Sequence, residues 1–419
     1  MNYALEALNR ERLDYTSKGL PFIADVAPSK VRRNGWNILN GDLPFPLMVL
    51  KESALEYNLK AMDEWCAENN FLLAPHGKTT MCPQLYERQL ACGAWAITVA
   101  TVSQAMVCVR FGIQRIFIAN QVIGDGNFRA LAALLGAGSN AEIYCLLDSV
   151  AGLQQLVTGL QKFGAQRVIN VLLEVGRKGW RTGIRSPEQF TDIYHEAVKY
   201  PEILSLRGIE AFEGSASDAG EVDEFLAEFK MIGECFLKLW QEAEKPLLSI
   251  GGTAYLDRVL LLSREISSDF QFVVRSGCYV THDHGLYQRK HQTSQLRIRG
   301  TAHLPDFRPA LELWSYVQSI PENHYAFLTF GKRDTSHDID LPVPLFSIRG
   351  NQRQRLTDAQ VVKLQDQHAY LSFGDGVDLQ IGDLVCCGIS HPCTAFDKWR
   401  VLPVVNDDYD VIDLYRTFF

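Results

Sequence analysis

A lysine follows the first strongly apolar run of the chain. Lys78 stands in FLLAPHGKTT (71–80), three residues after the run FLLAP ends. Burial beside apolar surface penalises the charged ammonium, so a lysine there loses its proton easily and becomes a nucleophilic amine. The residue types also allow the plainer alternative of a lysine solvated at the surface.

Two later segments combine a short apolar run with glycine and small polar residues. They are SIGGTAY (249–255) and VVRSGCY (273–279). Backbone N–H groups and hydroxyls at the end of a strand can bind phosphate, and glycine lets the backbone approach an anion closely. The phosphate-binding candidates are Gly251, Gly252, Thr253, Ser276, Gly277 and Cys278. Each segment by itself is equally consistent with a simple turn.

A histidine and a cysteine lie two residues apart near the carboxyl terminus. His391 and Cys393 belong to GISHPCTAFDKW (388–399). In an extended strand, residues two apart face the same way. Imidazole and thiolate together favour zinc, and two protein ligands would leave positions open for substrate or water. The alternative is a hydrogen-bonded histidine beside a buried cysteine.

The elements that must position these residues follow a regular rhythm. Eight apolar runs, bounded by glycine, proline or polar residues, alternate with stretches of helical length, as in strands buried on both faces. The runs are 71–75, 94–100, 115–120, 141–148, 168–175, 206–212, 247–252 and 271–277, and the helix candidates include 51–69, 82–92, 103–111, 152–163, 187–199 and 221–244. Eight such units predict a (β/α)8 TIM-type barrel. An open doubly wound sheet is the alternative, but its glycine fingerprint is missing after the first strand.

If the chain forms a barrel, the lysine and the two glycine segments lie at the same end of it. Active sites of such barrels lie at the carboxyl ends of the strands, and the last two loops commonly bind phosphate. Lys78 follows the first predicted strand, and the two glycine segments follow the seventh and eighth. After about residue 290, short β-rich runs dominate, beginning with QLRIRGTAHL (295–304). They predict a second, all-β domain.

This pattern divides the chain into three parts. We expect an N-terminal segment over 1–45 that packs on the β domain, a barrel over 46–290, and a β-rich domain over 291–419 that carries the histidine–cysteine pair.

The composition is that of an ordinary globular protein. Hydrophobic residues make up 47% and charged residues 21%, which excludes disordered, fibrous and coiled-coil chains. The net charge of −8 gives no sign of a nucleic-acid or anionic-membrane surface. No apolar run approaches the ~20 residues of a membrane helix. The N-terminus lacks the apolar centre of a signal peptide, so we expect ten mostly reduced cysteines in a cytoplasmic protein.

Several of these segments, in this order, resemble the D-serine dehydratase and D-threonine aldolase family, whose barrel is similar to that of alanine racemase. The matching segments are PHGKT (75–79), ERQLACGAWAITVAT (87–101), GWRTG (179–183), GIEAFEG (208–214), SIGGT (249–253), RSGCY (275–279), DQHAYL (366–371) and SHPCTAFDKW (390–399). They extend over roughly residues 40–415.

The resemblance implies pyridoxal phosphate as cofactor. Lys78 takes the position of the lysine that carries the cofactor covalently, and the two glycine segments match those that hold its phosphate. Arg275 resembles the arginine of alanine racemase that faces the pyridine nitrogen. Arg181 matches an arginine that relatives direct toward the ring oxygen.

The resemblance also implies a metal. His391 and Cys393 match the zinc pair of the dehydratases, whereas aldolase relatives pair the histidine with aspartate. His368 resembles a histidine near the metal in the aldolase branch and is a candidate proton carrier. By the same resemblance, Lys332, Asp334 or Asp338 in the charged loop 331–340 would border the path of the substrate. The expected assembly is a homodimer.

The predicted function is elimination of the β-hydroxyl of a D-amino acid such as D-serine, giving a 2-oxo acid and ammonia. Lys78 would take the α-proton, and zinc would act on the hydroxyl as a Lewis acid. The nearest alternative is an aldolase that cleaves β-hydroxy D-amino acids to glycine and an aldehyde. A racemase is more distant, because it needs a second base, commonly a tyrosine, and no tyrosine can be assigned that role by pattern; Tyr279 and Tyr325 are formal possibilities. A non-catalytic pyridoxal-phosphate carrier would need neither the β-rich domain nor the histidine–cysteine pair.

Overall fold

An eight-stranded parallel barrel carries the first two thirds of the chain. The computed structural model describes residues 3–138, 140–266 and 268–419. The barrel strands are β4 (Leu72–Leu73), β5 (Ile97–Val99), β6 (Arg115–Ile118), β7 (Glu142–Leu147), β8 (Ile169–Val175), β9 (Leu204–Ala211), β10 (Leu247–Ser249) and β11 (Gln271–Val274). Their order, β4-β11-β10-β9-β8-β7-β6-β5, places β4 and β5 at the two ends of the path. Backbone bonds from Trp95 N to Leu73 O (2.7 Å) and from Thr98 N to Pro75 O (2.9 Å) join these ends and close the barrel.

A helix follows each barrel strand, and one more precedes the barrel. In chain order they are α2 (Glu52–Glu68), α3 (Pro83–Ala91), α4 (Val102–Arg110), α5 (Asp125–Leu134), α6 (Val150–Lys162), α7 (Pro187–Ala197), α8 (Ala219–Leu239), α9 (Leu256–Glu265) and α10 (Leu286–Ile298). Several start at a side-chain cap: Thr101, Ser149 and Ser186 accept hydrogen bonds from backbone N–H groups of the first turn. The predicted TIM-type barrel is therefore confirmed, with all eight predicted strands in place.

The apolar runs that predicted the strands are buried on both faces. In β7 and β8, the side chains that point inward meet a separate cluster inside the barrel, and those that point outward pack under the helices. The interior cluster is made of Ala74, Ala96, Phe117, Ala119, Tyr144, Leu146, Leu172, Leu247 and Val273. The barrel centre is thus filled, and only its mouth is left for chemistry.

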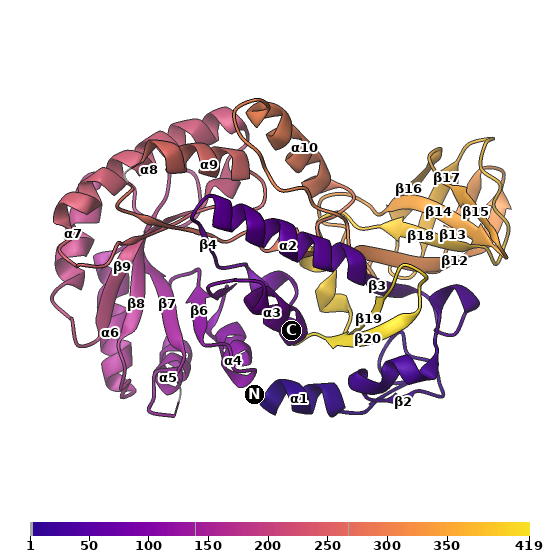
Figure 1. Cartoon of the computed structure of the whole chain (residues 1–419), viewed down its shortest axis with the longest axis horizontal. Helices are drawn as coiled ribbons and strands as arrows, with labels where there is room; N and C mark the ends of the chain where they lie inside the picture. The colour runs from indigo at the N-terminus through magenta and orange to yellow at the C-terminus, as the bar shows by residue number, and fades with distance from the viewer. Residues whose placement is uncertain (1–2, 139, 267) are drawn as a thin grey trace.

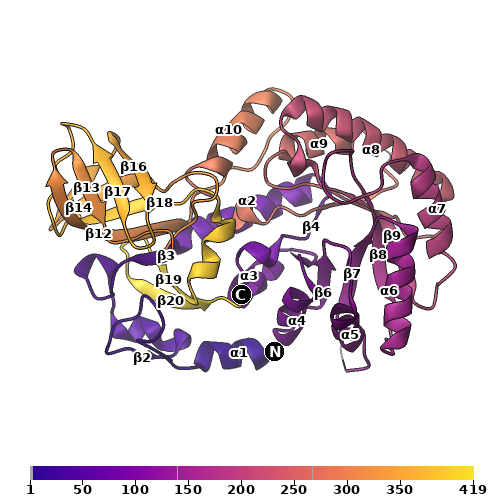
Figure 2. The ribbon, with the colours of Figure 1, turned by 180° about the vertical axis from the view of Figure 1, so that it is seen from behind.

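A second, antiparallel sheet forms the predicted β-rich domain (Figures 1 and 2). Its strands are β12 (Leu311–Glu322), β13 (Tyr325–Leu328), β14 (Val343–Arg349), β15 (Gln352–Arg355), β16 (Ala359–Leu364), β17 (Ala369–Phe373), β18 (Leu384–Gly388), β19 (Val401–Val405) and β20 (Val411–Arg416). The strand β3 (Leu47–Lys51) pairs with β12 and β19, so this early segment belongs to the same sheet.

The amino-terminal residues pack against the β-rich domain. They form α1 (Tyr3–Arg10) and a two-stranded pair of β1 (Leu13–Asp14) with β2 (Asp25–Val26). Lys18 lies 2.6 Å from a carboxylate oxygen of Asp334 and over the ring of Trp399. Phe418 contacts Phe111, with ring centroids 4.8 Å apart, in a cluster with Leu5 and Leu8 of α1, so the two ends of the chain lie near each other (Figure 1).

One predicted β run is wrong. QLRIRGTAHL (295–304) begins as the last turn of α10. The signal for this helix lies twelve residues upstream, where one carboxylate oxygen of Asp283 accepts bonds from the N–H groups of Gly285, Tyr287 and Gln288. That cap starts the helix, and the apolar residues of 295–298 then pack as a helix end.

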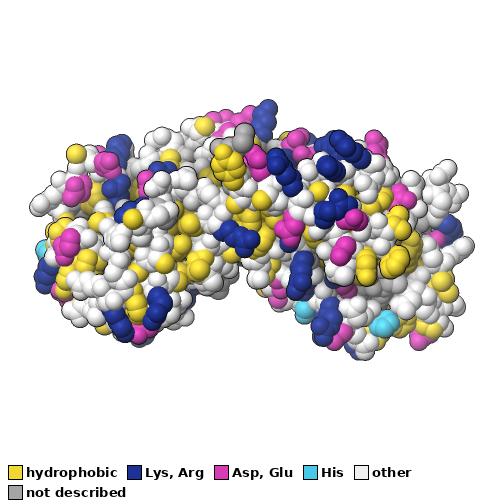
Figure 3. Space-filling view, turned by 90° about the horizontal axis from the view of Figure 1, so that it is seen from below, with side chains coloured by type: hydrophobic (Ala, Val, Ile, Leu, Met, Phe, Trp, Pro, Cys, Tyr) yellow, Lys and Arg dark blue, Asp and Glu magenta, His cyan; other side chains and the backbone are white. Residues whose placement is uncertain are grey.

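Basic and acidic side chains are interspersed on the face drawn in Figure 3, which shows the barrel and the β-rich domain as two lobes with a hollow between them. Within the described residues, no helix is long and apolar enough to cross a membrane.

Candidate active site

A cavity of about 310 Å³ opens at the carboxyl ends of the barrel strands. Its wall comes from the loops after the barrel strands, from α10, and from the turn that carries the histidine–cysteine pair. Of the residues predicted from the sequence, those that line it are Lys78, Arg181, Gly251, Gly252, Thr253, Arg275, Gly277, Cys278, His391 and Cys393. Ser276 and His368 are not among the lining residues.

Lys78 lies in a short 3-10 turn, Gly77–Thr79, directly after β4. It is exposed toward the cavity and makes no ion pair or hydrogen bond with any part of the chain that the structure describes. Burial, helped by the charges of Lys78, Arg275 and Arg181, holds the pKa of the neighbouring His76 well below its usual range. The cavity wall therefore carries a neutral imidazole close to the side chains of Lys78, Arg181 and Arg275.

Arg275 is held rigidly at the end of β11. Its guanidinium is ion-paired with the buried Glu210 and donates to Ser249 Oγ and to the carbonyl of Ala211 (3.1 Å). Burial raises the pKa of Glu210 to about 7, although Arg275 opposes this shift. The signal for Glu210 was present in GIEAFEG, since an acidic residue inside a buried barrel strand needs a cationic partner.

The two glycine segments lie side by side, but their donors are not all free. Gly252 N and Gly251 N donate to the buried carboxylate of Glu213, at 2.7 and 3.3 Å. Ser276 Oγ donates to the carbonyl of Gly252 (3.1 Å) and is fully buried, so it ties the two loops together. Burial raises the pKa of Glu213. Glu213 was not predicted as a site residue from the sequence.

Other backbone donors remain available in these loops. The N–H groups of Thr253, Gly277 and Cys278 reach no acceptor among the described residues. A Cβ at Gly277 would lie 2.3 Å from the carbonyl oxygen of His76, so the backbones of the first and last barrel loops approach too closely for any side chain. Free N–H groups beside Lys78, Arg181 and Arg275 suit an anionic group such as a phosphate.

His391 and Cys393 meet through a turn and not through an extended strand, so the predicted local geometry is wrong. Residues Pro392–Thr394 form a 3-10 turn, and His391 adopts a left-handed backbone conformation (φ 57°). The conformation is stabilised by a bond from His391 N to Asp283 (2.8 Å). The two carboxylate oxygens of Asp283 therefore hold the first turn of α10 and the backbone of His391 at the same time.

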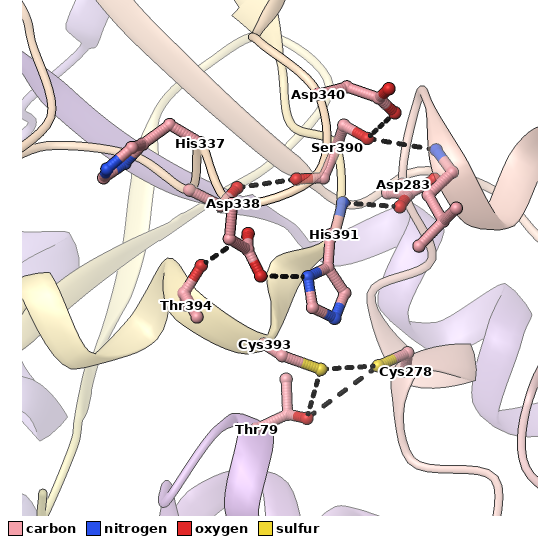
Figure 4. Close-up of polar contacts among 12 residues, drawn as sticks. Thr79, Cys278, Asp283, His337, Asp338, Asp340, Ser390, His391, Cys393 and Thr394 are labelled. Atoms are coloured by element: carbon pink, nitrogen blue, oxygen red, sulfur yellow. Dashed lines mark hydrogen bonds and ion pairs between the residues drawn. The ribbon is translucent and has the colours of Figure 1, made fainter. Parts of the chain in front are cut away.

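Asp338 orients the imidazole. Its Oδ2 lies 2.6 Å from His391 Nδ1, and its Oδ1 accepts from Thr394 Oγ1 (3.0 Å), as Figure 4 shows. The other ring nitrogen of His391 faces Cys393. The contact with Cys393 raises the pKa of His391 to about 9, and contacts with Cys278 and His391 hold the pKa of Cys393 well below its usual range. Thiolate, imidazole and a supporting carboxylate are the groups that bind zinc in proteins.

The described residues offer two metal ligands here, not a closed cage. They contain no group of three or more histidine, cysteine, aspartate or glutamate side chains arranged to hold a metal ion.

One predicted residue, His368, and the two tyrosines named for the racemase alternative lie elsewhere. His368 stands at the start of β17, near the ring of Phe327, away from the cavity of its own chain. Tyr279 is buried and its hydroxyl faces Gln89, and Tyr325 packs on Phe327 in the β-rich domain. Tyr287 of α10, which the sequence analysis did not consider, is the tyrosine that lines the cavity.

Comparisons with known proteins agree with this architecture. Residues 310–405 match the family model described as "Putative serine dehydratase domain". A D-threonine aldolase of an Arthrobacter species is 34% identical over 170 residues, which are 41% of this chain and 43% of that protein. A 3-hydroxy-D-aspartate aldolase of Paracoccus denitrificans (strain Pd 1222) is 24% identical over 350 residues, which are 82% of this chain and 83% of the relative.

Solved structures share the whole fold. The D-threonine aldolase of Filomicrobium marinum superimposes with a TM-score of 0.75 at 21% identity, over 93% of this chain and 98% of the other. The D-threo-3-hydroxyaspartate dehydratase of a Delftia species superimposes with a TM-score of 0.69 at 18% identity, over 90% of this chain and 98% of the other. An alanine racemase of Clostridium difficile superimposes with a TM-score of 0.61 at 12% identity, over 90% of this chain and 99% of the other. These comparisons confirm that the chain resembles the D-serine dehydratase and D-threonine aldolase-like family, with the barrel and β-rich domain of an alanine racemase-type protein.

Proposed function

We propose that this protein is a pyridoxal-phosphate-dependent, metal-assisted lyase that acts on β-hydroxy D-amino acids. The observation that carries the proposal is the meeting of Lys78, the Arg275–Cys278 loop and the His391–Cys393 turn on one cavity. An amine, an anion-binding loop and a metal pair are the parts that this chemistry needs, and the first and last of them are more than 300 residues apart in the sequence.

Pyridoxal phosphate fits the residues that are present. Its phosphate would be held by the free N–H groups of Thr253, Gly277 and Cys278, with Arg181 and Arg275 nearby. Glu213, which occupies the N–H groups of Gly251 and Gly252, would hold that loop in shape. When bound, the cofactor supplies a conjugated ring that delocalises negative charge developing at Cα.

Lys78 would carry the cofactor and move the α-proton. Its amine has no partner among the described residues, so no bond has to be broken before it reacts. The guanidinium of Arg275 is fixed by its ion pair with Glu210, and it would leave a ring nitrogen beside it unprotonated. His391 and Cys393 would hold zinc, which supplies Lewis acidity for a β-hydroxyl.

Within this class we propose elimination, with D-serine as the first substrate to test. The support is Cys393, because the aldolase branch pairs the histidine with aspartate. Relatives with aldolase names and a structural neighbour with a dehydratase name both match this chain, so retro-aldol cleavage to glycine and an aldehyde is the second candidate.

The test uses the purified protein loaded with pyridoxal phosphate. It is incubated with D-serine, D-threonine or 3-hydroxy-D-aspartate, with and without EDTA, and the products are assayed as 2-oxo acid, ammonia, glycine and aldehyde. We expect 2-oxo acid and ammonia that disappear with EDTA, and none from L-serine. Glycine with an aldehyde would move the protein to the aldolase class. No product from any substrate would overturn the proposed function.

A lysine variant checks the cofactor separately. Lys78→Ala should lose the visible absorbance band of the lysine-bound cofactor together with activity. Lys60→Ala, at an exposed lysine of α2, is the control and should keep the band. A band that persists in Lys78→Ala would assign the covalent attachment to another residue.

Two expectations from the sequence also stand as proposals. We propose a homodimer, which analytical ultracentrifugation would detect. His368 does not line the cavity of its own chain, so its proposed role as proton carrier requires a partner subunit whose cavity it reaches. If the protein is a monomer in solution, both the proposed dimer and the proposed role of His368 are wrong.

A further inference from the structure

Two thiols from different domains touch at the cavity wall. Cys278 begins the 3-10 turn Cys278–Val280 after β11, and Cys393 lies in the turn Pro392–Thr394 of the β-rich domain. Their Sγ atoms are 3.4 Å apart (Figure 4). Thr79 Oγ1 lies 3.3 Å from the sulfur of Cys393 and 3.8 Å from that of Cys278, so the two thiols and one hydroxyl form a single cluster.

We propose that Cys278 and Cys393 form a redox-modification site, where an oxidant of the peroxide class converts the two thiols to a disulfide. The sulfur of Cys393 attacks one peroxide oxygen: the O–O bond breaks, an S–O bond forms and hydroxide leaves as water. The sulfur of Cys278 then attacks the Cys393 sulfur: the S–S bond forms, the S–O bond breaks and a second water leaves. Two thiols are oxidised, and one peroxide is reduced to two waters.

The geometry favours this pair over the other cysteines. A disulfide bond is about 2.05 Å long, so the two sulfur atoms, now 3.4 Å apart, need to approach each other by about 1.4 Å. Both residues line the open cavity, which admits a molecule as small as hydrogen peroxide. Of the other eight cysteines, six are buried in the core, Cys92 is half-buried and Cys235 is exposed on α8.

The disulfide would act on the proposed metal pair. A sulfur bonded to Cys278 has no thiolate to offer a metal, so oxidation removes one of the two ligands while His391 stays in place. Thiol reductants would restore the ligand. This consequence rests on the proposed function, but formation of the disulfide does not.

The experiment reads the disulfide directly by mass. The purified protein is treated with EDTA and titrated with hydrogen peroxide, then remaining thiols are alkylated and peptides are mapped without reduction. We expect the loss of two alkylation sites and one cross-linked peptide pair that joins Cys278 to Cys393, reversed by dithiothreitol. Cys278→Ser should lose the cross-link, whereas Cys235→Ser should keep it.

Other products would overturn the proposal. These are stable sulfinic or sulfonic acid on Cys393 without a cross-link, a cross-link between other cysteines, or unchanged loss of two thiols in Cys278→Ser. A zinc-loaded sample tests the link to the site: the cross-link should form at least tenfold more slowly. If the cross-link forms at the same rate with zinc, the metal role of Cys393 fails, while the redox site stands.

Discussion

The Nδ1 atom of His391 lies 2.6 Å from Oδ2 of Asp338, a residue of the loop that joins β13 to β14. This contact leaves the other ring nitrogen of His391 facing Cys393. A carboxylate behind a metal-binding histidine fixes the ring orientation and raises its basicity, and loss of such a partner typically costs 10- to 100-fold in metal affinity. Asp338 is therefore the residue that we expect to tune the metal pair.

Replacing Asp338 by asparagine should weaken zinc binding about 10- to 100-fold, as measured by competition with a chelator. The visible band of the loaded cofactor should remain, because Lys78 is untouched. Asp366→Asn, at an exposed ion pair with Arg333, is the matched control. Equal zinc affinity in the Asp338 and Asp366 variants would contradict this role.

The buried pair of Arg275 and Glu210 makes a prediction about stability. Arg275→Met leaves Glu210 buried without its partner, which should cost about 3–5 kcal/mol of unfolding free energy. Burial raises the pKa of Glu210 to about 7, above its unfolded value, so the folded state binds the proton more tightly and stability falls as pH rises. Without Arg275 the pKa rises further, so the loss should be larger at pH 8.5 than at pH 6.

Urea unfolding at the two pH values measures this difference. Arg115→Met is the control, because its pair with Glu142 is partly exposed and should contribute at most about 1 kcal/mol. A cost for Arg275→Met that is as small as the control, or that does not depend on pH, would show that the buried pair is not the source of the effect.

Gly277 makes a prediction about the cofactor loop. An alanine there would place its Cβ 2.3 Å from the carbonyl oxygen of His76, so the loops after β4 and β11 must separate. We expect a loss of about 1–3 kcal/mol in stability, typical of overpacking, together with weaker binding of pyridoxal phosphate.

The control is Gly126→Ala in α5, where a Cβ would meet nothing within 4 Å. Alanine favours a helix over glycine, so this variant should be stabilised by up to about 1 kcal/mol. Thermal unfolding and cofactor titration compare the two variants. Normal cofactor binding by Gly277→Ala would argue against a phosphate site in this loop.

Buried histidines near α10 predict acid sensitivity. Burial lowers the pKa of His284 and of His291 to about 4, below their unfolded value of about 6.5. The folded state therefore binds fewer protons than the unfolded state. The two histidines thus make their full contribution to the free energy of unfolding above pH 6.5, and this contribution is lost as the pH falls toward 4. Since one pKa unit corresponds to ~1.4 kcal/mol, protonation of each histidine should lower the free energy of unfolding by roughly 3 kcal/mol.

His291→Gln should flatten the decline of stability between pH 6.5 and pH 4.5. His195→Gln, an exposed position of α7, should leave the decline unchanged. Unfolding midpoints in urea at several pH values check both. An identical decline in His291→Gln and in the parent protein would place the acid sensitivity elsewhere.

Local patterns of the sequence predicted the barrel well, because parallel strands buried on both faces need continuous apolar runs. All eight runs became strands, and Lys78 and the glycine segments therefore follow the strands that the pattern assigned to them. The strand predicted within 295–304 was wrong because the first residues of this segment form the last turn of α10. The residue whose carboxylate holds the start of this helix, Asp283, lies twelve positions upstream.

The amino-acid sequence by itself determined the type of fold and the chemical groups of the site: a lysine, an arginine, two glycine loops and a histidine–cysteine pair. Only the tertiary structure decided which groups meet. The 3.4 Å contact between Cys278 and Cys393 joins residues 115 positions apart, and Glu213 takes the N–H groups of Gly251 and Gly252 that the pattern alone had left for phosphate. The physical reason is that periodicity sets the burial of each strand, whereas contacts between loops depend on how the closed barrel and the second domain pack against each other.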